Sequence, residues 1–478
     1  MAFLIGGANS EVAGYNIENS LRFDGDSYQS RDPSETGITI KGNFSAWVKF
    51  ATSNTEVALF GGFDSSGAND NDGYMVFKRT ADGNLQFEGG DNVYLETTAL
   101  FRDTSAWYHI VLAIDSSNAT ANNKQRIYVN GAEITAFDTR NNLTNLQDLP
   151  MNSTAGNDDR FLVGCDEDTG GRGLFFTGYM ADVYWIDNNS QMAASDFGEY
   201  NDNGVWIPKD GSDISFGDKN SFKMEYGSSG NLGLDSSGLG NSLGDNAGLA
   251  ATNQTTDTPT NNFATLNPLM AGRSSTLSEG NLKVTGESDN TYDVATFGSS
   301  MKWYMEWKVD ENFDGSGGGI RIGAIHEDDV QVAFGSLGNT TAKYYTNSND
   351  GKTQFGGGNN ETTGLTRATT NDIIMCACDG AGAKIWWGIN GTWLDYGSGA
   401  GDPAAGNNAA PWTNAMKAGI WFPATVYSGT AASGTLNLGN PPIAISSSQA
   451  DDNGYGNFEY DVPAGFYSLC TKNLAEYG

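Results

Sequence analysis

Paired carboxylates are the first residues to weigh, because a retaining glycoside hydrolase needs two carboxyl groups about 5–5.5 Å apart. In the segment EWKVDE, Glu306 and Asp310 fall on one face of the expected strand. Lys308 stands between them, where a further acid would be needed, and a strand edge that meets a turn explains the two acids equally well. We therefore expect no catalytic residues here, and a glycan depolymerase is the weakest of the alternatives.

The chain has only two histidines, His109 and His326. Catalysis by a metal held on histidines needs more ligands than these two. A Ser-His-Asp triad is not predicted either. Both histidines are predicted to be structural, and His109 to be hydrogen-bonded within its strand.

Calcium is the better candidate among metals, because hard cations prefer oxygen ligands. The loop from Asp64 to Gly73 is rich in them, and Asp64, Asp70 and Asp72 are the candidate ligands. A second acidic cluster spans 156–160 and 165–170. Neither loop has EF-hand spacing, so ordinary acidic turns remain the alternative. No other cofactor is expected.

Aromatic side chains in loops are the candidate ligand-binding residues. Trp393, Tyr396 and Trp412 lie in Gly- and Pro-rich segments, where an exposed ring can stack on a sugar or anchor a protein contact. The alternative is core packing at the edges of the modules. Trp386 and Trp387 are adjacent on a strand and must therefore face opposite sides of the sheet.

The elements that position these residues are strands. One pattern occurs twice, in residues 107–134 and 372–394: an apolar strand, a polar loop, a second strand, an Asn-Gly turn and the start of a third strand. Asn-Gly between apolar runs is the strongest short-range signal for a hairpin. In GNFSAWVKF, Phe44, Ala46, Val48 and Phe50 alternate on one side, as in a half-buried strand.

The composition favours an all-β chain and excludes some partners. Gly accounts for 63 of 478 residues, and aromatic residues for 12%, which suits turns, strands and packed cores rather than disorder. The net charge of −32, from 26 basic and 58 acidic residues, argues against direct binding of nucleic acid and against docking to an anionic membrane. The same charge favours solubility.

The cysteines and the N-terminal segment bear on the compartment. The four cysteines lack any Cys-x-x-Cys pair, and Cys376 and Cys378 share one strand face, so buried free thiols are expected. The first residues, MAFLIGGANSEVAG, lack a basic region, and their apolar stretch is too short for a signal peptide. No window has the roughly 18 apolar residues of a membrane span. We expect a protein made in a cytoplasm without standard secretion.

Four parts follow from the pattern along the chain. Residues 1–20 form an N-terminal arm, 21–208 a β-sandwich, 209–262 a Gly/Ser/Asn-rich linker that lies over a domain surface, and 263–478 a second β-sandwich. The best candidate for a helix is 191–201.

Several sequence segments resemble those of known families. SAWVKF (45–50), WYHIVLAID (107–115), IYVNGAEI (127–134) and FTGYMADVYWID (176–187) resemble the laminin G-like, concanavalin A-like lectin module over roughly 20–208. The C-terminal part resembles a SPRY-like domain in the segments KWYMEWKV (302–309), KIWWGINGTWL (384–394) and PAGFYSLC (463–470). The sequences of these segments are similar to those of tailed-bacteriophage proteins, notably marine ones. The segment 440–466 departs from the family by a long polar insertion, an extra contact surface or decoration.

The resemblance implies two antiparallel, jelly-roll β-sandwich domains in a bacteriophage virion. The expected role is a tail fibre or receptor-binding component that binds host-surface glycan or protein without catalysis. The arm 1–20 is expected to dock to other virion proteins, and the chain to form a homo-oligomer, such as a trimer. A capsid decoration or head appendage protein that contacts only other virion subunits is the alternative. The expected location is the virion, assembled in the host cytoplasm.

Overall fold

In the computed structural model, both Asn-Gly pairs form tight turns between antiparallel strands. Asn130 and Gly131 have φ of 47° and 84°, and Asn390 and Gly391 have φ of 50° and 80°. Positive φ at both central residues is the requirement of a type I′ turn. The hairpin predictions are therefore confirmed.

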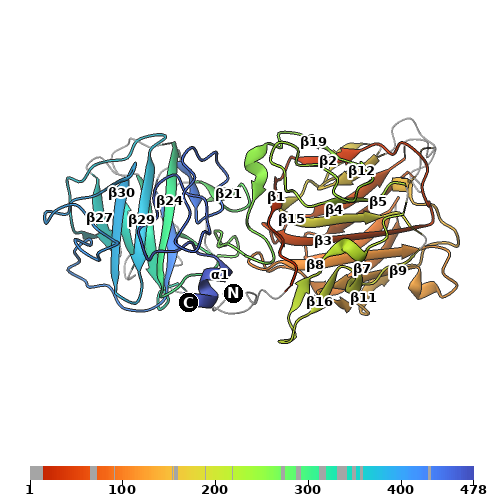
Figure 1. Cartoon of the computed structure of the whole chain (residues 1–478), viewed down its shortest axis with the longest axis horizontal. Coiled ribbons are helices and arrows are strands. Elements are labelled where there is room, and N and C mark those ends of the chain that lie inside the picture. Colours follow the sequence, from red (N-terminus) through yellow and green to blue (C-terminus); the bar gives the residue numbers. More distant parts are fainter. Residues whose placement is uncertain are drawn as a thin grey trace. The chain divides into compact units, whose positions relative to one another are not determined.

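The structure describes residues 14–64, 73–90, 92–152, 154, 160–168, 170–188, 190–217, 219–270, 275–286, 292–311, 319–330, 342–346, 351–355, 359–428 and 432–478. These residues fall into two units that meet in sequence between Thr260 and Asn261. Each unit is an antiparallel β-sandwich (Figure 1), so the predicted fold class is confirmed. Within the described residues, no helix has the length and apolarity needed to cross a bilayer.

The first sandwich packs two sheets against each other. One sheet has the order β10 (Ala132–Glu133), β9 (Gln125–Val129), β8 (Tyr108–Asp115), β3 (Lys41–Phe50), β15 (Thr177–Ile186), β1 (Ser20–Asp24) and β20 (Gln254–Thr255), and β18 (Phe222–Met224) also pairs with β15. The other has the order β11 (Phe137–Arg140), β7 (Asn92–Leu100), β6 (Asn84–Gly89), β5 (Tyr74–Arg79), β4 (Val57–Phe63), β12 (Arg160–Val163), β2 (Tyr28–Arg31) and β19 (Gly244–Asn246).

The core between these sheets follows the predicted alternation. Phe44, Ala46, Val48 and Phe50 of β3 are buried in it. The ring of Phe60 from the second sheet stacks on Trp185 of the first, with centroids 4.8 Å apart. Alternate residues of β3 point to the outer face of the first sheet.

The second sandwich is built in the same way. One sheet has the order β21 (Thr276–Ser278), β22 (Lys283–Thr285), β33 (Ser433–Asn437), β24 (Lys302–Glu311), β29 (Ile373–Asp379), β30 (Lys384–Ile389) and β31 (Thr392–Trp393). The other has the order β23 (Tyr292–Val294), β32 (Trp421–Ser428), β25 (Gly319–His326), β26 (Lys343–Thr346), β27 (Lys352–Phe355) and β28 (Asn359–Asn360). As predicted, Trp387 faces the core and Trp386 the opposite side of the sheet. The four cysteines are buried and free, as predicted.

The predicted linker is part of the first sandwich. Strands β18, β19 and β20 come from residues 209–260 and pair with β15, β2 and β1. The prediction of a linker over 209–262 is thus wrong, because this Gly/Ser/Asn-rich segment supplies edge strands of both sheets. The first sandwich runs to Thr260.

The predicted arm is also shorter than expected. Ile17 is 3% exposed and packs with Trp47, Trp107 and Tyr179 on the outer face of the first sheet. The backbone carbonyl of Ile17 accepts a hydrogen bond from Thr260 Oγ1 at 2.9 Å. Residues 14–20 therefore belong to the sandwich, and residues 1–13 lie outside the described part of the chain.

The helix predicted at 191–201 does not form. The segment contains the 3-10 turn η3 (Ala194–Asp196) and then β16 (Gly198–Tyr200), which pairs with β17 (Trp206–Pro208). Burial of Ala194 and Phe197 against β8 and β15 decides its conformation. An α-helix that was not predicted, α1 (Thr471–Tyr477), lies at the end of the chain.

A third layer covers one sheet of each sandwich. In the first, residues 192–216 pack on the outer face of β8 and β15. In the second, Phe458 and Phe466 pack on the outer face around Tyr304, Met375 and Trp386. The predicted insertion at 440–466 is therefore a structural cover, and both faces of these sheets are buried.

Candidate functional site

A small hollow in the described structure lies within the covering layer of the first sandwich. Beyond β15 the chain turns at Asp187 and returns over the outer face of its own sheet. Asn43 fixes its course, because its Nδ2 donates to the carbonyl of Ser190 at 2.9 Å and its Oδ1 accepts from the N–H of Met192 at 2.8 Å. Gln191 Nε2 donates to the carbonyl of Asn123 at 2.6 Å. The segment is thus fastened to β3 and to the 3-10 turn η1 (Ala121–Asn123).

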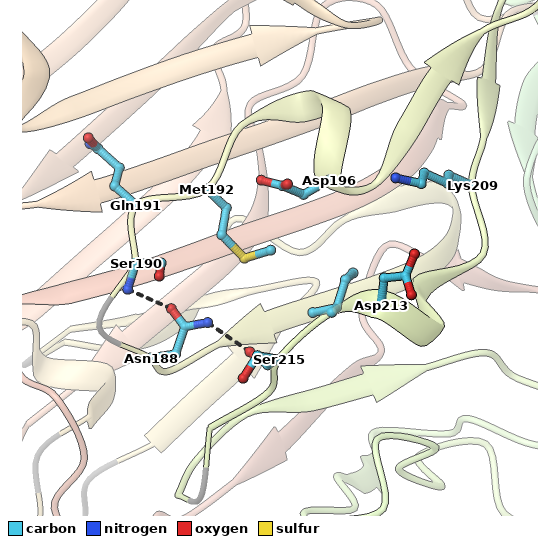
Figure 2. A pocket seen from close by; sticks show the side chains of 9 residues that line it. Asn188, Ser190, Gln191, Met192, Asp196, Lys209, Asp213 and Ser215 are labelled. Carbon is cyan, nitrogen blue, oxygen red and sulfur yellow. Dashed lines mark hydrogen bonds between the residues drawn. The ribbon is translucent and has the colours of Figure 1, made fainter.

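Two short 3-10 turns shape the hollow, η3 and η4 (Gly211–Asp213). Together they leave a cavity of about 210 Å³, which is lined by Asn188, Ser190, Gln191, Met192, Asp196, Lys209, Asp213, Ile214 and Ser215. Figure 2 shows Met192 and Asp196 bordering it from the η3 side, and Lys209 and Asp213 from the η4 side. All of these residues belong to the first sandwich.

Some of the polar side chains serve the pocket's own structure. Asn188 Oδ1 accepts from the N–H of Ser190 at 2.9 Å, and its Nδ2 donates to the carbonyl of Ser215 at 2.7 Å, as drawn in Figure 2. One carboxylate oxygen of Asp196 accepts from the N–H of Ala193 at 2.8 Å. These bonds hold the wall in one shape before any ligand arrives.

Other polar groups of the pocket are unengaged. Among the described residues, the ammonium of Lys209 and the carboxylate of Asp213 form no hydrogen bond or ion pair. The second carboxylate oxygen of Asp196 forms no hydrogen bond to a described residue either. The side chains of Met192 and Ile214 add an apolar surface. A cation, carboxylates and an apolar patch around a small hollow can bind a polar ligand, and they provide no paired nucleophile and base.

Beneath the covering layer lies a buried histidine. His109 Nε2 is 2.9 Å from Ser45 Oγ, and Nδ1 accepts from the indole N–H of Trp206 at 3.1 Å. The proton therefore sits on Nε2, which donates to the serine. Burial lowers the pKa of His109 to about 3. The prediction of a structural, hydrogen-bonded histidine is confirmed, and His109 helps to seat Trp206.

The three predicted aromatic residues do not form one binding platform. Tyr396 is only 9% exposed and its hydroxyl accepts from the N–H of Trp387 at 2.9 Å. Trp412 is half-buried against Trp387, with ring centroids 6.0 Å apart. Trp393 packs near Tyr304, on the opposite side of the same sheet. The expectation of an exposed ring is corrected for Tyr396, which belongs to the core.

The predicted calcium ligands lie mostly outside the described residues. Asp70 and Asp72 are not described, and Asp64 is half-buried, with its N–H bonded to the carbonyl of Gly73 at 2.7 Å. In the second acidic cluster, Glu167 pairs with Arg172 at 3.1 Å and with Arg160 at 3.5 Å. Within the described part of the chain, no group of three His, Cys, Asp or Glu side chains is arranged for a metal. Calcium at 64–73 stays a prediction.

The predicted carboxylate pair has a structural role. Glu306 is 2% exposed, and its carboxylate accepts from the N–H groups of Glu459 and Tyr460 at 2.9 and 2.8 Å and from the Tyr304 hydroxyl at 3.0 Å. Asp310 accepts from Thr435 Oγ1 at 2.6 Å. Four residues apart on one strand, the two acids are separated by about 13 Å, far beyond the spacing of a retaining pair.

Sequence reasoning did not find the pocket residues. Asp196 was placed in an expected helix, and Lys209 and Asp213 in an expected linker. An isolated lysine between acids in a segment with few other cations was the available signal.

Comparison with known proteins supports the assignment of the first module. Residues 25–189 match the family model described as the concanavalin A-like lectin/glucanases superfamily, of laminin G type. This range agrees with the resemblance predicted for roughly 20–208. No curated protein sequence matches the chain.

The chain is also similar to parts of several solved structures. The SPRY domain of human HERC1 is 17% identical, with 36% of this chain and 96% of that chain covered and a TM-score of 0.27. Domains LG4-5 of the mouse laminin alpha1 chain are 10% identical, with 91% and 92% covered and a TM-score of 0.28. The CBM40 of the Ruminococcus gnavus IT-sialidase, bound to alpha2,3 sialyllactose, is 16% identical, with 35% and 89% covered and a TM-score of 0.25.

Proposed function

We propose that this protein attaches a bacteriophage particle to its host by non-catalytic binding, as a tail fibre or receptor-binding component. The sequence segments of the C-terminal module that resemble bacteriophage proteins support the phage context. The laminin G-type match at 25–189 supports the binding role. The proposed ligand is a glycan or protein of the host surface, met by loops and covering segments that rigid sandwiches hold in place.

The burial and hydrogen bonding of Glu306 are the observation that favours binding over hydrolysis. Glu306 and Asp310, in the second sandwich, are the carboxylate pair that a hydrolase would use. A general acid or nucleophile must reach its substrate. Glu306 instead fastens the covering segment at Glu459 and Tyr460 from beneath and is 2% exposed.

Binding and hydrolysis can be separated on purified host envelope. We expect the full-length protein to sediment with host envelope or polysaccharide and to release no reducing ends. Glu306→Gln should lower the melting temperature, because the two N–H groups bond to different carboxylate oxygens and the amide replaces one oxygen by an NH2 donor. Release of reducing ends that disappears in Glu306→Gln would show that the protein is a depolymerase.

Position on the particle tests the phage role. Cryo-microscopy of whole particles, with the protein located by antibody, should place it on the tail or at a host-facing tip. Labelling of heads by a protein that never binds host envelope would show a capsid decoration protein instead. Its absence from particles would refute the virion role.

A further inference from the structure

We propose that the pocket between η3 and η4 binds one neutral, hydroxyl-rich sugar unit, held between Lys209 and Asp213 over an apolar floor of Met192 and Ile214. This inference rests on the proposed attachment role, for which it names a ligand class and a site.

The charges around the pocket favour a ligand without net charge. The ammonium of Lys209 can only donate hydrogen bonds, whereas the carboxylate of Asp213 and the unengaged oxygen of Asp196 can only accept them. A sugar hydroxyl both donates and accepts, so neighbouring hydroxyls of one ring can satisfy both signs together. A uronic acid would bring a carboxylate toward two aspartates, and an amino sugar would bring an ammonium toward Lys209.

The shape and lining suit one ring. A volume of about 210 Å³ is below the range of about 300–1,000 Å³ that is usual for drug-sized ligands. Met192 and Ile214 offer an apolar surface for the C–H face of a pyranose. Because hydrogen bonds to Ser215, Asn43 and Asn123 fix the lining residues Asn188, Ser190 and Gln191, little ordering is needed on binding.

The affinity of one site should be weak. A ring of about a dozen heavy atoms, bound without an aromatic stacking partner among the lining residues, has a dissociation constant on the order of 1 mM. Attachment would then depend on many sugar units and several protein copies engaging at once.

The test is a titration of the full-length protein with single sugars. Galactose, glucose and mannose serve as neutral probes, with glucuronate and glucosamine as charged ones, and binding is followed by saturation-transfer NMR. Lys209→Met and Asp213→Asn are the pocket variants, since neither side chain has a structural bond among the described residues. The half-buried Lys283 and the exposed Asp202, whose side chains likewise form no bond among the described residues, give matched controls, Lys283→Met and Asp202→Asn.

We expect at least one neutral sugar to bind more tightly than both charged probes, with an affinity about tenfold or more lower in each pocket variant and unchanged in the controls. Neutral-sugar binding that survives both pocket variants, preference for a charged sugar, or no binding at all would overturn the inference.

The two proposals can fail separately. If the wild type and the pocket variants bind host envelope equally, the pocket assignment falls and attachment stands. If a neutral sugar binds in the pocket but the protein binds no host envelope, attachment falls and the pocket stands.

Discussion

The indole ring of Trp206 lies directly against Gly131, so a Cβ at that glycine would overlap it. The second sandwich repeats the arrangement, because a Cβ at Gly391 would come within 3.0 Å of the ring of Tyr460. In both turns the asparagine side chain accepts a hydrogen bond at 2.8 Å, Asn130 from the N–H of His109 and Asn390 from that of Ile373. Each Asn-Gly turn thus reverses the chain and also seats the layer that covers the sheet.

Replacing the turn glycines should therefore loosen both features. Gly131→Ala places a Cβ in a left-handed backbone, at a cost of about 1–2 kcal/mol, and forces Trp206 away. We expect its unfolding free energy to fall by about 2 kcal/mol or more, measured by urea unfolding followed by tryptophan fluorescence.

Asn130→Gly is the matched control for this prediction. It keeps the positive φ and leaves room for Trp206, and it loses only the hydrogen bond to His109, worth about 1 kcal/mol. If Gly131→Ala were no more destabilising than Asn130→Gly, contact with the indole would not contribute.

Asp182 should make the first sandwich less stable as the pH rises. It is 3% exposed and sits where the pairing of β15 with β3 shifts register. Burial raises its pKa to about 7, the nearby Lys223 opposes this shift, and Glu225 and Asp210 add to it. Since the unfolded pKa is near 3.9, the folded state binds more protons between about pH 4 and 7, and stability is lost across that window.

Asp182→Asn should remove this loss. Asparagine tolerates the φ of 43° at this position and carries no charge to bury. We expect the variant to be more stable than the wild type at pH 8, by a few kcal/mol at most, and to show little difference at pH 4, as measured by calorimetry. Equal stability of both proteins at pH 8 would contradict the prediction.

His109 should act in the opposite direction. Its folded pKa of about 3 lies below the unfolded value near 6.5, so the unfolded chain binds more protons and stability falls as the pH drops from about 6.5 to 3. Nitrogen-15 NMR should show one neutral ring with its proton on Nε2 down to about pH 4. Protonation of the ring near pH 6.5 in the folded protein would refute the assignment.

The contribution of the Lys49–Asp257 ion pair to the free energy of unfolding should depend on both partners. Their side chains are 1% and 0% exposed, with Nζ and Oδ2 2.8 Å apart, and Trp107 donates to the other oxygen at 3.1 Å. Asp257→Ala leaves a buried ammonium and should cost about 3–5 kcal/mol. The double variant Lys49→Met, Asp257→Ala should be less destabilised than the sum of its single variants in a urea double-mutant cycle, whereas additive losses would show that the pair is not coupled.

The sequence predicted those parts of the fold that local chemistry specifies. The Asn-Gly turns, the alternation of Phe44 to Phe50 and the opposite faces of Trp386 and Trp387 all follow from backbone geometry, and the structure has them. Strand β19 could not be found in this way, because Gly244–Asn246 contains no apolar residue and is recognisable only by its partner β2.

The candidate site was harder to predict for a related reason. Tyr396 stands in a glycine-rich loop that suggests exposure, yet its hydroxyl bonds to the backbone of Trp387 in the core. Lys209 and Asp213 have no motif, and they meet Asp196 only because the chain folds back over β8 and β15. Side chains gathered by a covering segment leave no fixed spacing in the sequence.

The late strands of the first sandwich also set an order of events during synthesis. Strand β1 begins at Ser20, but its partner β20 ends at Thr255. When only the first 208 residues have been synthesised, β1 and β2 still lack their partners β20 and β19. A truncated product ending there would leave the edges of β1 and β2 unpaired, and unpaired edge strands favour aggregation.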